Sequence, residues 1–454
     1  MIDMTPPDMS LEHLSTGLDA GRLTSRELVE ACLARIADPS GEGTRVYTRV
    51  DAVGARHAAD AADAARTRGE RTRRHAGIPI SIKDLFDIEG QVTAAGSRVL
   101  ADAPPATRDA AAVARLRAAG FVIIGRTNMT EFAYSGLGLN PHYGTPLNPY
   151  DRKTGRIPGG SSSGAAVSVT DGMAAVGLGT DTGGSCRIPA ALTGLTGFKP
   201  TAARVPATGA FPLSTTLDSI GGIGHTVNCC AAVDAVLSGD PAYPDEQAPL
   251  ASLRIGVPRT LVLDGMDGNV AAAFEASLRR LSQAGAAIVD LPFAELSELA
   301  AINAKGGYTA AESYPLHRDM MARHGDRYDP RVRVRIEKGA RLTAQDIAAL
   351  HAQRADWIRR ASRHFETLDL IACPTVPVIA PAVRELASDE AYGRTNLLVL
   401  RNPTFVNFLD GCAISLPCHE PGTAPVGLML AALGGQDRRL LAAARAVEAL
   451  LAAR

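Results

Sequence analysis

The 454-residue sequence lacks the features that mark several classes of protein. Its 47 basic and 48 acidic residues nearly cancel, so charge provides no basis for binding nucleic acid or an anionic membrane. No apolar run approaches the roughly 18 residues that a membrane-spanning helix needs. The first ten residues, MIDMTPPDMS, lack the basic-then-apolar order of a signal peptide. We therefore expect a soluble, cytoplasmic protein that binds neither nucleic acid nor a membrane.

Metal-binding and nucleotide-binding patterns are missing as well. The seven cysteines form no C-x-x-C pair, and no His/Cys cluster has the spacing of metal ligands. An odd number of cysteines without such spacing is typical of reduced thiols in the cytoplasm. No G-x-x-x-x-G-K-[ST] sequence occurs, and the segment Gly177–Gly184 departs from the G-x-G-x-x-G spacing. The sequence therefore predicts no metal and no cofactor.

What the sequence does contain is an alternation of helical patterns and short apolar strands. This alternation predicts an α/β fold in which helices cover a central sheet. A capping box at Thr24–Glu27 predicts the start of one helix. The segment from about 300 to 365 is more charged and mostly helical. Strands are expected at 78–83, 121–125, 174–179, 253–257, 287–291, 368–373, 412–418 and 425–432.

The organisation of the chain favours one domain. We find no internal repeat and no low-complexity tract that would mark a linker between domains. The sequence therefore predicts a single domain over residues 1–454. The segment at about 300–365 is expected to be a helical insertion that contributes to the substrate entrance.

Three segments carry residues suited to nucleophilic catalysis. Ser161 and Ser185 each follow a pair of glycines, and the apolar run at 78–82 ends on Lys83. Paired glycines are unfavourable inside helices and strands, so around a hydroxyl they indicate a sharp turn or N–H groups aimed at a ligand. A lysine becomes a base when burial lowers its pKa from about 10.4. We hypothesise that Ser185 is a nucleophile, Ser161 a proton relay and Lys83 the base.

The residues before Ser185 complete this arrangement. Successive backbone N–H groups of Thr182, Gly183, Gly184 and Ser185 can converge on one oxygen, because glycine allows the backbone to approach a substrate closely. Such donors would form an oxyanion hole for the tetrahedral intermediate of acyl transfer.

Each segment also has a simpler interpretation when it is taken alone. A serine after two glycines can cap a helix, the second serine loop can bind phosphate, and Lys83 can be a surface charge. The segment Gly160–Gly164 also matches the G-x-S-x-G nucleophile elbow, which would make Ser162 the nucleophile and require a downstream acid and histidine. No downstream histidine has a distinctive context, and this scheme leaves Lys83 and Ser185 unexplained. The joint occurrence of the three segments favours acyl transfer.

These segments resemble the amidase signature family. PISIKD, GGSSSG and GTDTGGSCRIP occur in the family's order, and the similarity is dense from about 75 to 235 and returns near 370 to 435. The resemblance implies a single α/β domain with a mixed central sheet covered by helices. It implies Ser185 as nucleophile, Ser161 on a cis peptide as the bridging serine, Lys83 as base, and an oxyanion hole from the backbone of 182–185. No metal or cofactor is implied.

The resemblance also assigns supporting residues. Asp181 and Arg187 match positions that look structural in such enzymes, so we expect them to pair and brace the loop. Ser163 stands where many members have glycine, and we expect it to support the site by hydrogen bonding. Tyr134 is a candidate wall of the acyl pocket.

The expected activity is hydrolysis of a linear carboxylic amide through an acyl-enzyme. Because only 4% of the residues are aromatic, a deep channel for long acyl chains is disfavoured, and we expect a small or polar amide as the partner. The alternative is the amide-hydrolysing subunit of a tRNA-dependent amidotransferase, since such subunits look similar through these segments. A non-catalytic descendant is disfavoured because all three catalytic side chains are present. A homodimer is an open possibility.

Overall fold

One continuous sheet of mixed direction forms the centre of the molecule. The computed structural model describes residues 9–70, 72–240 and 247–453; most of the decapeptide on which the signal-peptide expectation rests lies outside them. The strand order is β1-β3-β2-β4-β6-β5-β10-β11-β9-β7-β8. The strands are β1 (Tyr47–Val50), β2 (Pro79–Lys83), β3 (Val122–Thr127), β4 (Val176–Asp181), β5 (Thr196–Lys199), β6 (Ser219–Gly224), β7 (Arg254–Pro258), β8 (Ala287–Leu291), β9 (Leu370–Pro374), β10 (Cys412–Pro417) and β11 (Gly427–Ala432).

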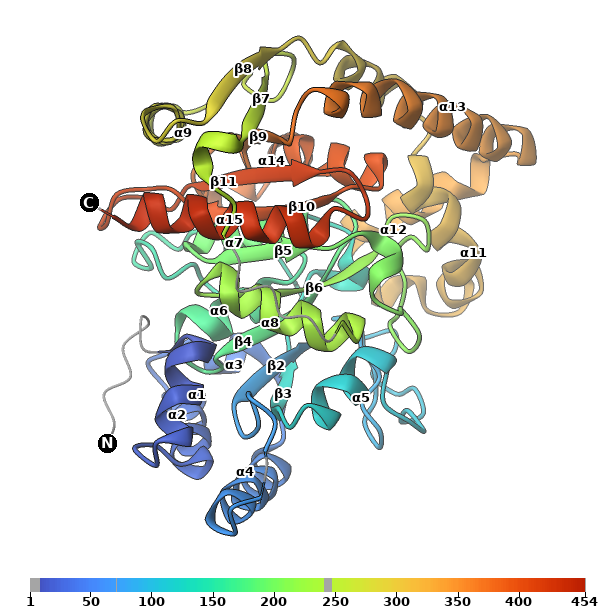
Figure 1. Ribbon diagram of the computed structural model, residues 1–454. Coiled ribbons are helices and arrows are strands. Elements are labelled where there is room, and N and C mark those ends of the chain that lie inside the picture. The colour runs from blue at the N-terminus through green and yellow to red at the C-terminus, as the bar shows by residue number, and fades with distance from the viewer. Residues whose placement is uncertain (1–8, 71, 241–246, 454) are drawn as a thin grey trace.

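The directions of the strands confirm the predicted α/β fold with a mixed sheet. Strand β2 runs parallel to both β3 and β4, and β7 runs parallel to both β8 and β9. The strands between these two groups pair antiparallel. In Figure 1 the sheet extends from β2 and β3 at the bottom to β7 and β8 at the top, as one single-domain body.

Helices cover the sheet, and most of them pack through apolar side chains. They are α1 (Leu11–Asp19), α2 (Ser25–Ala37), α3 (Gly43–Val46), α4 (Ala52–Thr67), α5 (Ala111–Ala118), α6 (Ser163–Thr170), α7 (Arg187–Thr193), α8 (Val227–Ser238), α9 (Gly268–Gln283), α10 (Leu299–Ile302), α11 (Gly307–His324), α12 (Pro330–Ile336), α13 (Ala344–Ser362), α14 (Asp389–Leu409) and α15 (Asp437–Ala452). None of the described helices is long and apolar enough to cross a membrane.

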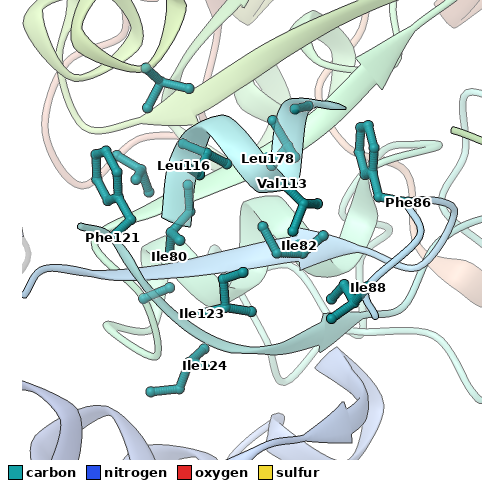
Figure 2. Packing of buried hydrophobic residues seen from close by; sticks show 14 of the residues in the cluster. Ile80, Ile82, Phe86, Ile88, Val113, Leu116, Phe121, Ile123, Ile124 and Leu178 are labelled. Carbon is teal, nitrogen blue, oxygen red and sulfur yellow. The ribbon is translucent and has the colours of Figure 1, made fainter. Parts of the chain in front are cut away.

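The strand that carries Lys83 is held by a large apolar cluster. Ile80 and Ile82 of β2 are fully buried and share this cluster with Val113 and Leu116 of α5 (Figure 2). Burial of each such side chain stabilises the fold by roughly 1.5–3 kcal/mol. The position of the last residue of β2 is therefore fixed by tightly packed neighbours.

Most of the elements expected from the sequence are present, with ends that differ by one or two residues. The capping box is confirmed, with Thr24 and Glu27 each accepting from the other's backbone N–H. The segment at about 300–365 is helical as predicted, and α11 and α13 lie together on one side of the molecule (Figure 1).

Strands β1, β5 and β6 were not expected. The sequence of strand β6 is SIGGIG. Glycine is depleted in strands, so this segment does not have the pattern that predicts one. The structure explains the glycines: a Cβ at Gly221 would lie 2.0 Å from the carbonyl oxygen of Phe198, and one at Gly222 would crowd Val233. Close approach of backbone between β5 and β6 therefore requires residues that β-propensity disfavours.

Candidate active site

The predicted site residues meet at one edge of the sheet. Lys83 is the last residue of β2, and the parallel neighbour β4 ends at Asp181, directly before the second serine loop. Because parallel strands end at the same edge, the lysine and this loop lie close together. The first serine loop precedes α6, which packs against β4.

Lys83 is fully buried and has two hydroxyl partners. Its Nζ donates to Ser161 Oγ at 2.7 Å and to Thr180 Oγ1 at 2.8 Å. Burial lowers the pKa of Lys83 to about 8, although negative charge at Asp218 and Asp181 opposes this shift. About a tenth of the amine is therefore uncharged at pH 7 and about half at pH 8, as a base requires.

Ser161 is buried in a tightly packed loop. The peptide bond between Gly160 and Ser161 is cis. Ser161 is fully buried, and its carbonyl oxygen accepts from Thr130 N at 3.1 Å. A Cβ at Gly160 would lie 2.6 Å from the backbone nitrogen of Gly138, so only glycine fits there. The hydroxyl of Ser161 thus faces Lys83 from a fixed backbone.

Ser185 lies in the turn between β4 and α7. Ser185 is 3% exposed, and its hydroxyl makes no hydrogen bond within the described parts of the chain. Its carbonyl oxygen accepts from Ser162 N at 3.3 Å, which joins the backbones of the two serine loops. The arrangement leaves the Ser185 hydroxyl available to react.

The four predicted oxyanion donors do not behave alike. Gly184 N donates to Asp181 Oδ1 at 2.9 Å, so this N–H is already engaged within the protein. Across residues 9–70, 72–240 and 247–453, the backbone N–H groups of Thr182, Gly183 and Ser185 have no partner. Three of the four groups are therefore free to donate to a substrate oxygen in this conformation.

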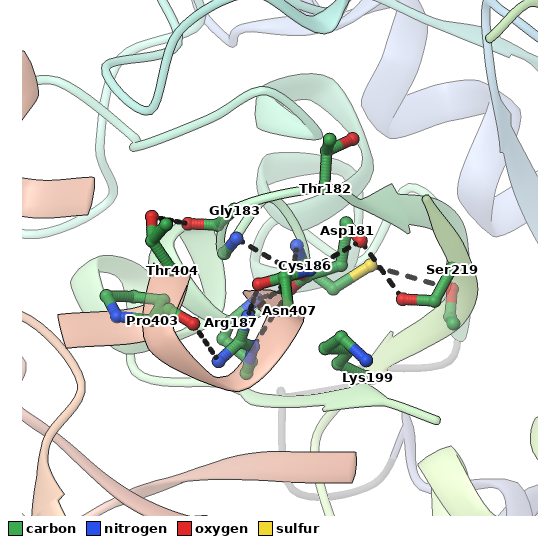
Figure 3. Close-up of polar contacts among 12 residues, drawn as sticks. Asp181, Thr182, Gly183, Cys186, Arg187, Lys199, Ser219, Pro403, Thr404 and Asn407 are labelled. Carbon is green, nitrogen blue, oxygen red and sulfur yellow. Dashed lines mark hydrogen bonds and ion pairs between the residues drawn. The ribbon is translucent and has the colours of Figure 1, made fainter. Parts of the chain in front are cut away.

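A buried ion pair braces the second serine loop. Arg187 contacts both carboxylate oxygens of Asp181, with Nη2 2.8 Å from Oδ1 and Nε 3.0 Å from Oδ2 (Figure 3). Burial raises the pKa of Asp181, but Arg187, with help from Lys199 and Asn407, outweighs burial and holds it well below its usual range. The expected pairing is thus present, and the carboxylate stays ionised.

Helix α14 completes this brace. Asn407 donates to the carbonyl oxygen of Asp181 at 3.0 Å and to Oδ1 at 2.9 Å, and it accepts from Arg187 Nη2 at 2.7 Å (Figure 3). Thr404 Oγ1 donates to the carbonyl oxygen of Gly183 at 3.3 Å. The loop is therefore fixed from a helix that follows it by more than two hundred residues.

The two remaining predicted site residues, Ser163 and Tyr134, contact other parts of the chain. Ser163 is buried at the start of α6, with a long 3.5 Å contact from its hydroxyl to the carbonyl oxygen of Asn128. Tyr134 is half-buried, its hydroxyl lies 3.5 Å from the carbonyl oxygen of Arg335, and burial raises its pKa. Neither side chain forms a hydrogen bond to the three catalytic candidates.

The nucleophile-elbow alternative does not fit this geometry. Ser162 is fully buried, and its hydroxyl donates to the carbonyl oxygen of Thr180 at 3.3 Å rather than to a histidine. A serine in this environment has neither a base nor access to substrate.

Sequence reasoning missed three contributors. Thr180 lies within the glycine-rich block, but nothing in the sequence sets it apart, although it binds Lys83. Asn407 has no sequence signal, because its partners are far away in the chain. Asp218 lies in a DSIGG segment without a recognisable role, yet it accepts from Thr182 Oγ1 at 2.5 Å.

Comparison with known proteins identifies the family of this chain. Residues 27–441 match the family model described as Amidase. The chain is 35% identical to 2-amino-5-chloromuconic acid deaminase of Comamonas testosteroni, over 98% of this chain and 97% of that protein. It is 34% identical to a subunit of the glutamyl-tRNA(Gln) amidotransferase of Chloroflexus aggregans, over 93% and 92%. A crystal structure of an amidase superposes with a TM-score of 0.86 at 30% identity, covering 97% and 99% of the two chains. The chain therefore belongs to the amidase (amidase signature) family.

Proposed function

We propose that the protein hydrolyses a linear carboxylic amide to an acid and ammonia or an amine, through an acyl-enzyme on Ser185. One observation carries the proposal. Lys83, a buried amine with a lowered pKa, lies 2.7 Å from Ser161 Oγ. The loop that carries Ser161 is joined to Ser185 by a backbone hydrogen bond from Ser162 N to Ser185 O. The base is thus in contact with the relay, and the nucleophile lies in the neighbouring loop, so that proton transfer from Ser185 to Ser161 is part of the proposal.

The first half of the reaction forms the acyl-enzyme. Uncharged Lys83 accepts the Ser161 proton while Ser161 accepts that of Ser185, and Ser185 Oγ bonds to the carbonyl carbon. The C=O electron pair moves to oxygen, where the free N–H groups of Thr182, Gly183 and Ser185 stabilise the negative charge. Collapse breaks the C–N bond, and the leaving nitrogen takes the proton that returns through Ser161.

The second half releases the acid. A water molecule attacks the acyl carbon, and its proton passes to Lys83 through Ser161. Collapse of the second tetrahedral intermediate breaks the bond to Ser185 Oγ, which regains a proton by the same route. The enzyme returns to its starting state without a cofactor, so the three side chains and the backbone donors suffice.

The substrate entrance is proposed to include the helical insertion at about 300–365. A groove of about 670 Å³ is lined by Asp329, Pro330, Arg331, Val334 and Arg335 of this segment, facing residues 139–145 and the start of α14. Arg335 Nη1 donates to the carbonyl oxygen of Tyr134 at 2.9 Å, which connects the groove to the loop bearing the proposed pocket wall.

This groove supports a small, polar amide as substrate. Arg331 and Arg335 both stack over the ring of Tyr392, at 4.5 and 5.0 Å from its centre. Arg331 is paired with Asp389 at 2.7 Å, and Asp329 also lines the groove, so the groove carries charges of both signs and suits a polar substrate. The similar Comamonas protein is named for an acid substrate, in line with this proposal.

A second candidate function is the amide-hydrolysing subunit of a tRNA-dependent amidotransferase. The 34% identity to an amidotransferase subunit favours it, and the site geometry does not separate the two. Glutaminase activity that appears only when a second subunit co-purifies would identify this function. Ammonia or amine release by the isolated chain would identify the simple amidase.

Location and assembly are further proposals. All seven cysteines are free, which is the state expected in the reducing cytoplasm, so we propose a cytoplasmic enzyme. The homodimer stays a prediction, which light scattering of the purified protein would test.

The experiment that tests the function is a screen of amides for ammonia or amine release. The wild-type protein should hydrolyse at least one small amide, and Ser185→Ala should not. Ser277→Ala is the matched control, because Ser277 is also buried but its hydroxyl donates to Ala273 O within α9, outside the serine loops. Hydrolysis by Ser185→Ala at the wild-type rate would contradict the proposal.

A further inference from the structure

Asp218 lies directly beside the oxyanion loop, and the reaction described above does not use it. One carboxylate oxygen, Oδ1, accepts from Thr182 Oγ1 at 2.5 Å. The other, Oδ2, accepts from the backbone N–H groups of Leu213 and Ser214, at 3.0 and 3.2 Å. The carboxylate is thus fixed by the backbone on one side and holds the Thr182 side chain on the other.

Thr182 supplies one of the three free N–H groups of the proposed oxyanion hole. Its side-chain hydroxyl and its backbone nitrogen are separated by only two carbon atoms, so restraint of the hydroxyl also restrains the peptide. Oxyanion donors act because they are held in place before charge develops. A contact that fixes Thr182 therefore affects the reaction without contact with the substrate.

The turn that carries Asp218 is itself anchored to α11. Ser214 Oγ donates to Glu312 Oε2 at 2.5 Å, and Thr216 N donates to the same oxygen at 3.1 Å. Glu312 belongs to the segment that lines one side of the proposed entrance. Two carboxylates, Glu312 and Asp218, thus connect the helical insertion to the oxyanion loop.

We propose that Asp218 is a positioning residue, which orients the Thr182 N–H toward the oxyanion through the Thr182 hydroxyl. This inference rests on the proposed function, because it takes Ser185 as the nucleophile and residues 182–185 as the hole. Asp218 touches no reacting atom, so this positioning effect passes through Thr182; it is separate from the charge of Asp218, which acts on Lys83 by raising its pKa.

The test measures how fast a fluorophosphonate labels Ser185. In this reaction Ser185 Oγ bonds to phosphorus, its proton passes through Ser161 to Lys83, and fluoride leaves. The phosphoryl oxygen develops charge in the oxyanion hole, so no substrate needs to be known. We expect Thr182→Val and Asp218→Ala each to lower the second-order rate constant by about 10- to 100-fold. Thr182→Ser retains the hydroxyl and should label within about threefold of wild type.

The double variant decides whether the two residues act together. If Asp218 works through Thr182, the Thr182→Val/Asp218→Ala enzyme should label no more slowly than the slower single variant. Multiplied losses, or labelling of Asp218→Ala at the wild-type rate, would overturn the inference. Thr182→Val removes the contact without altering the turn, so the test stands even if Asp218→Ala folds poorly.

A matched control separates positioning from general stability. Asp234 on α8 is another buried carboxylate, paired with Arg204, and Asp234→Ala should lose thermal stability but label at the wild-type rate. Equal slowing of Asp234→Ala would overturn the inference. Absence of labelling at Ser185 in the wild type would instead contradict the proposed function itself.

Discussion

At the scale of single residues, the account depends on the chemistry of Lys83. We predict that Lys83→Ala lowers kcat/KM by about 10²- to 10⁴-fold, the range for loss of a general base. Lys83→Arg should be equally impaired, because a guanidinium stays charged near neutral pH and cannot accept a proton. Circular dichroism should show both variants folded. An arginine variant with near-wild-type turnover would contradict the role of Lys83 as base.

The same residue predicts the pH dependence. Burial lowers the pKa of Lys83 to about 8, and only the uncharged amine accepts a proton. Log kcat/KM should therefore rise with a slope of about one below pH 8 and level off above it. The slope should disappear from the residual activity of Lys83→Ala. A flat wild-type profile between pH 6.5 and 9 would show that this amine does not limit the reaction.

At this scale much of the site could be predicted from sequence. Lys83, Ser161 and Ser185 each have local signals, an apolar strand in one case and paired glycines in the others. The structure brings the segments of all three together, and their catalytic roles stay predictions. The engagement of Gly184 N with Asp181 could not be predicted, because it depends on the exact path of the loop.

At the scale of elements, the loop after β4 depends on the buried Asp181–Arg187 pair. Both side chains are fully buried, so Arg187→Met would leave Asp181 without its ion pair. We predict a loss of about 3–5 kcal/mol in the free energy of unfolding, measured with urea at pH 7. Arg394→Met breaks an exposed pair with Glu390 and should cost less than about 1 kcal/mol. Similar losses of unfolding free energy in Arg187→Met and Arg394→Met would show that the loop does not depend on the buried pair.

Elements differ in how far the sequence reveals them. Strands such as β2 and β8 are apolar or regularly patterned, so their positions could be predicted. Strand β6 could not, because its glycines serve the close approach of Phe198 rather than local propensity. The contribution of α14 could not be predicted either, since Asn407 accepts a hydrogen bond from Arg187, which lies 220 positions away in the sequence.

At the scale of the whole molecule, the continuous sheet predicts cooperative unfolding. The only tryptophan, Trp357, is fully buried in α13, inside the helical segment at about 300–365. Its ring packs near Phe293 and Phe408, so its fluorescence reports on that side of the molecule. We predict that fluorescence and far-ultraviolet circular dichroism give coincident urea transitions. A fluorescence transition at a lower urea concentration than the circular dichroism transition would show that this segment unfolds as a separate unit.

The central claim is that Ser185 carries the acyl group during turnover. The most direct measurement is rapid acid quenching of the enzyme with an amide that it hydrolyses, followed by peptide mass spectrometry. The account predicts the mass of the acyl group on the peptide containing Ser185, and its absence in Ser185→Ala. Turnover with the acyl group on another residue, Ser162 included, or with no covalent adduct at any quench time, would contradict it.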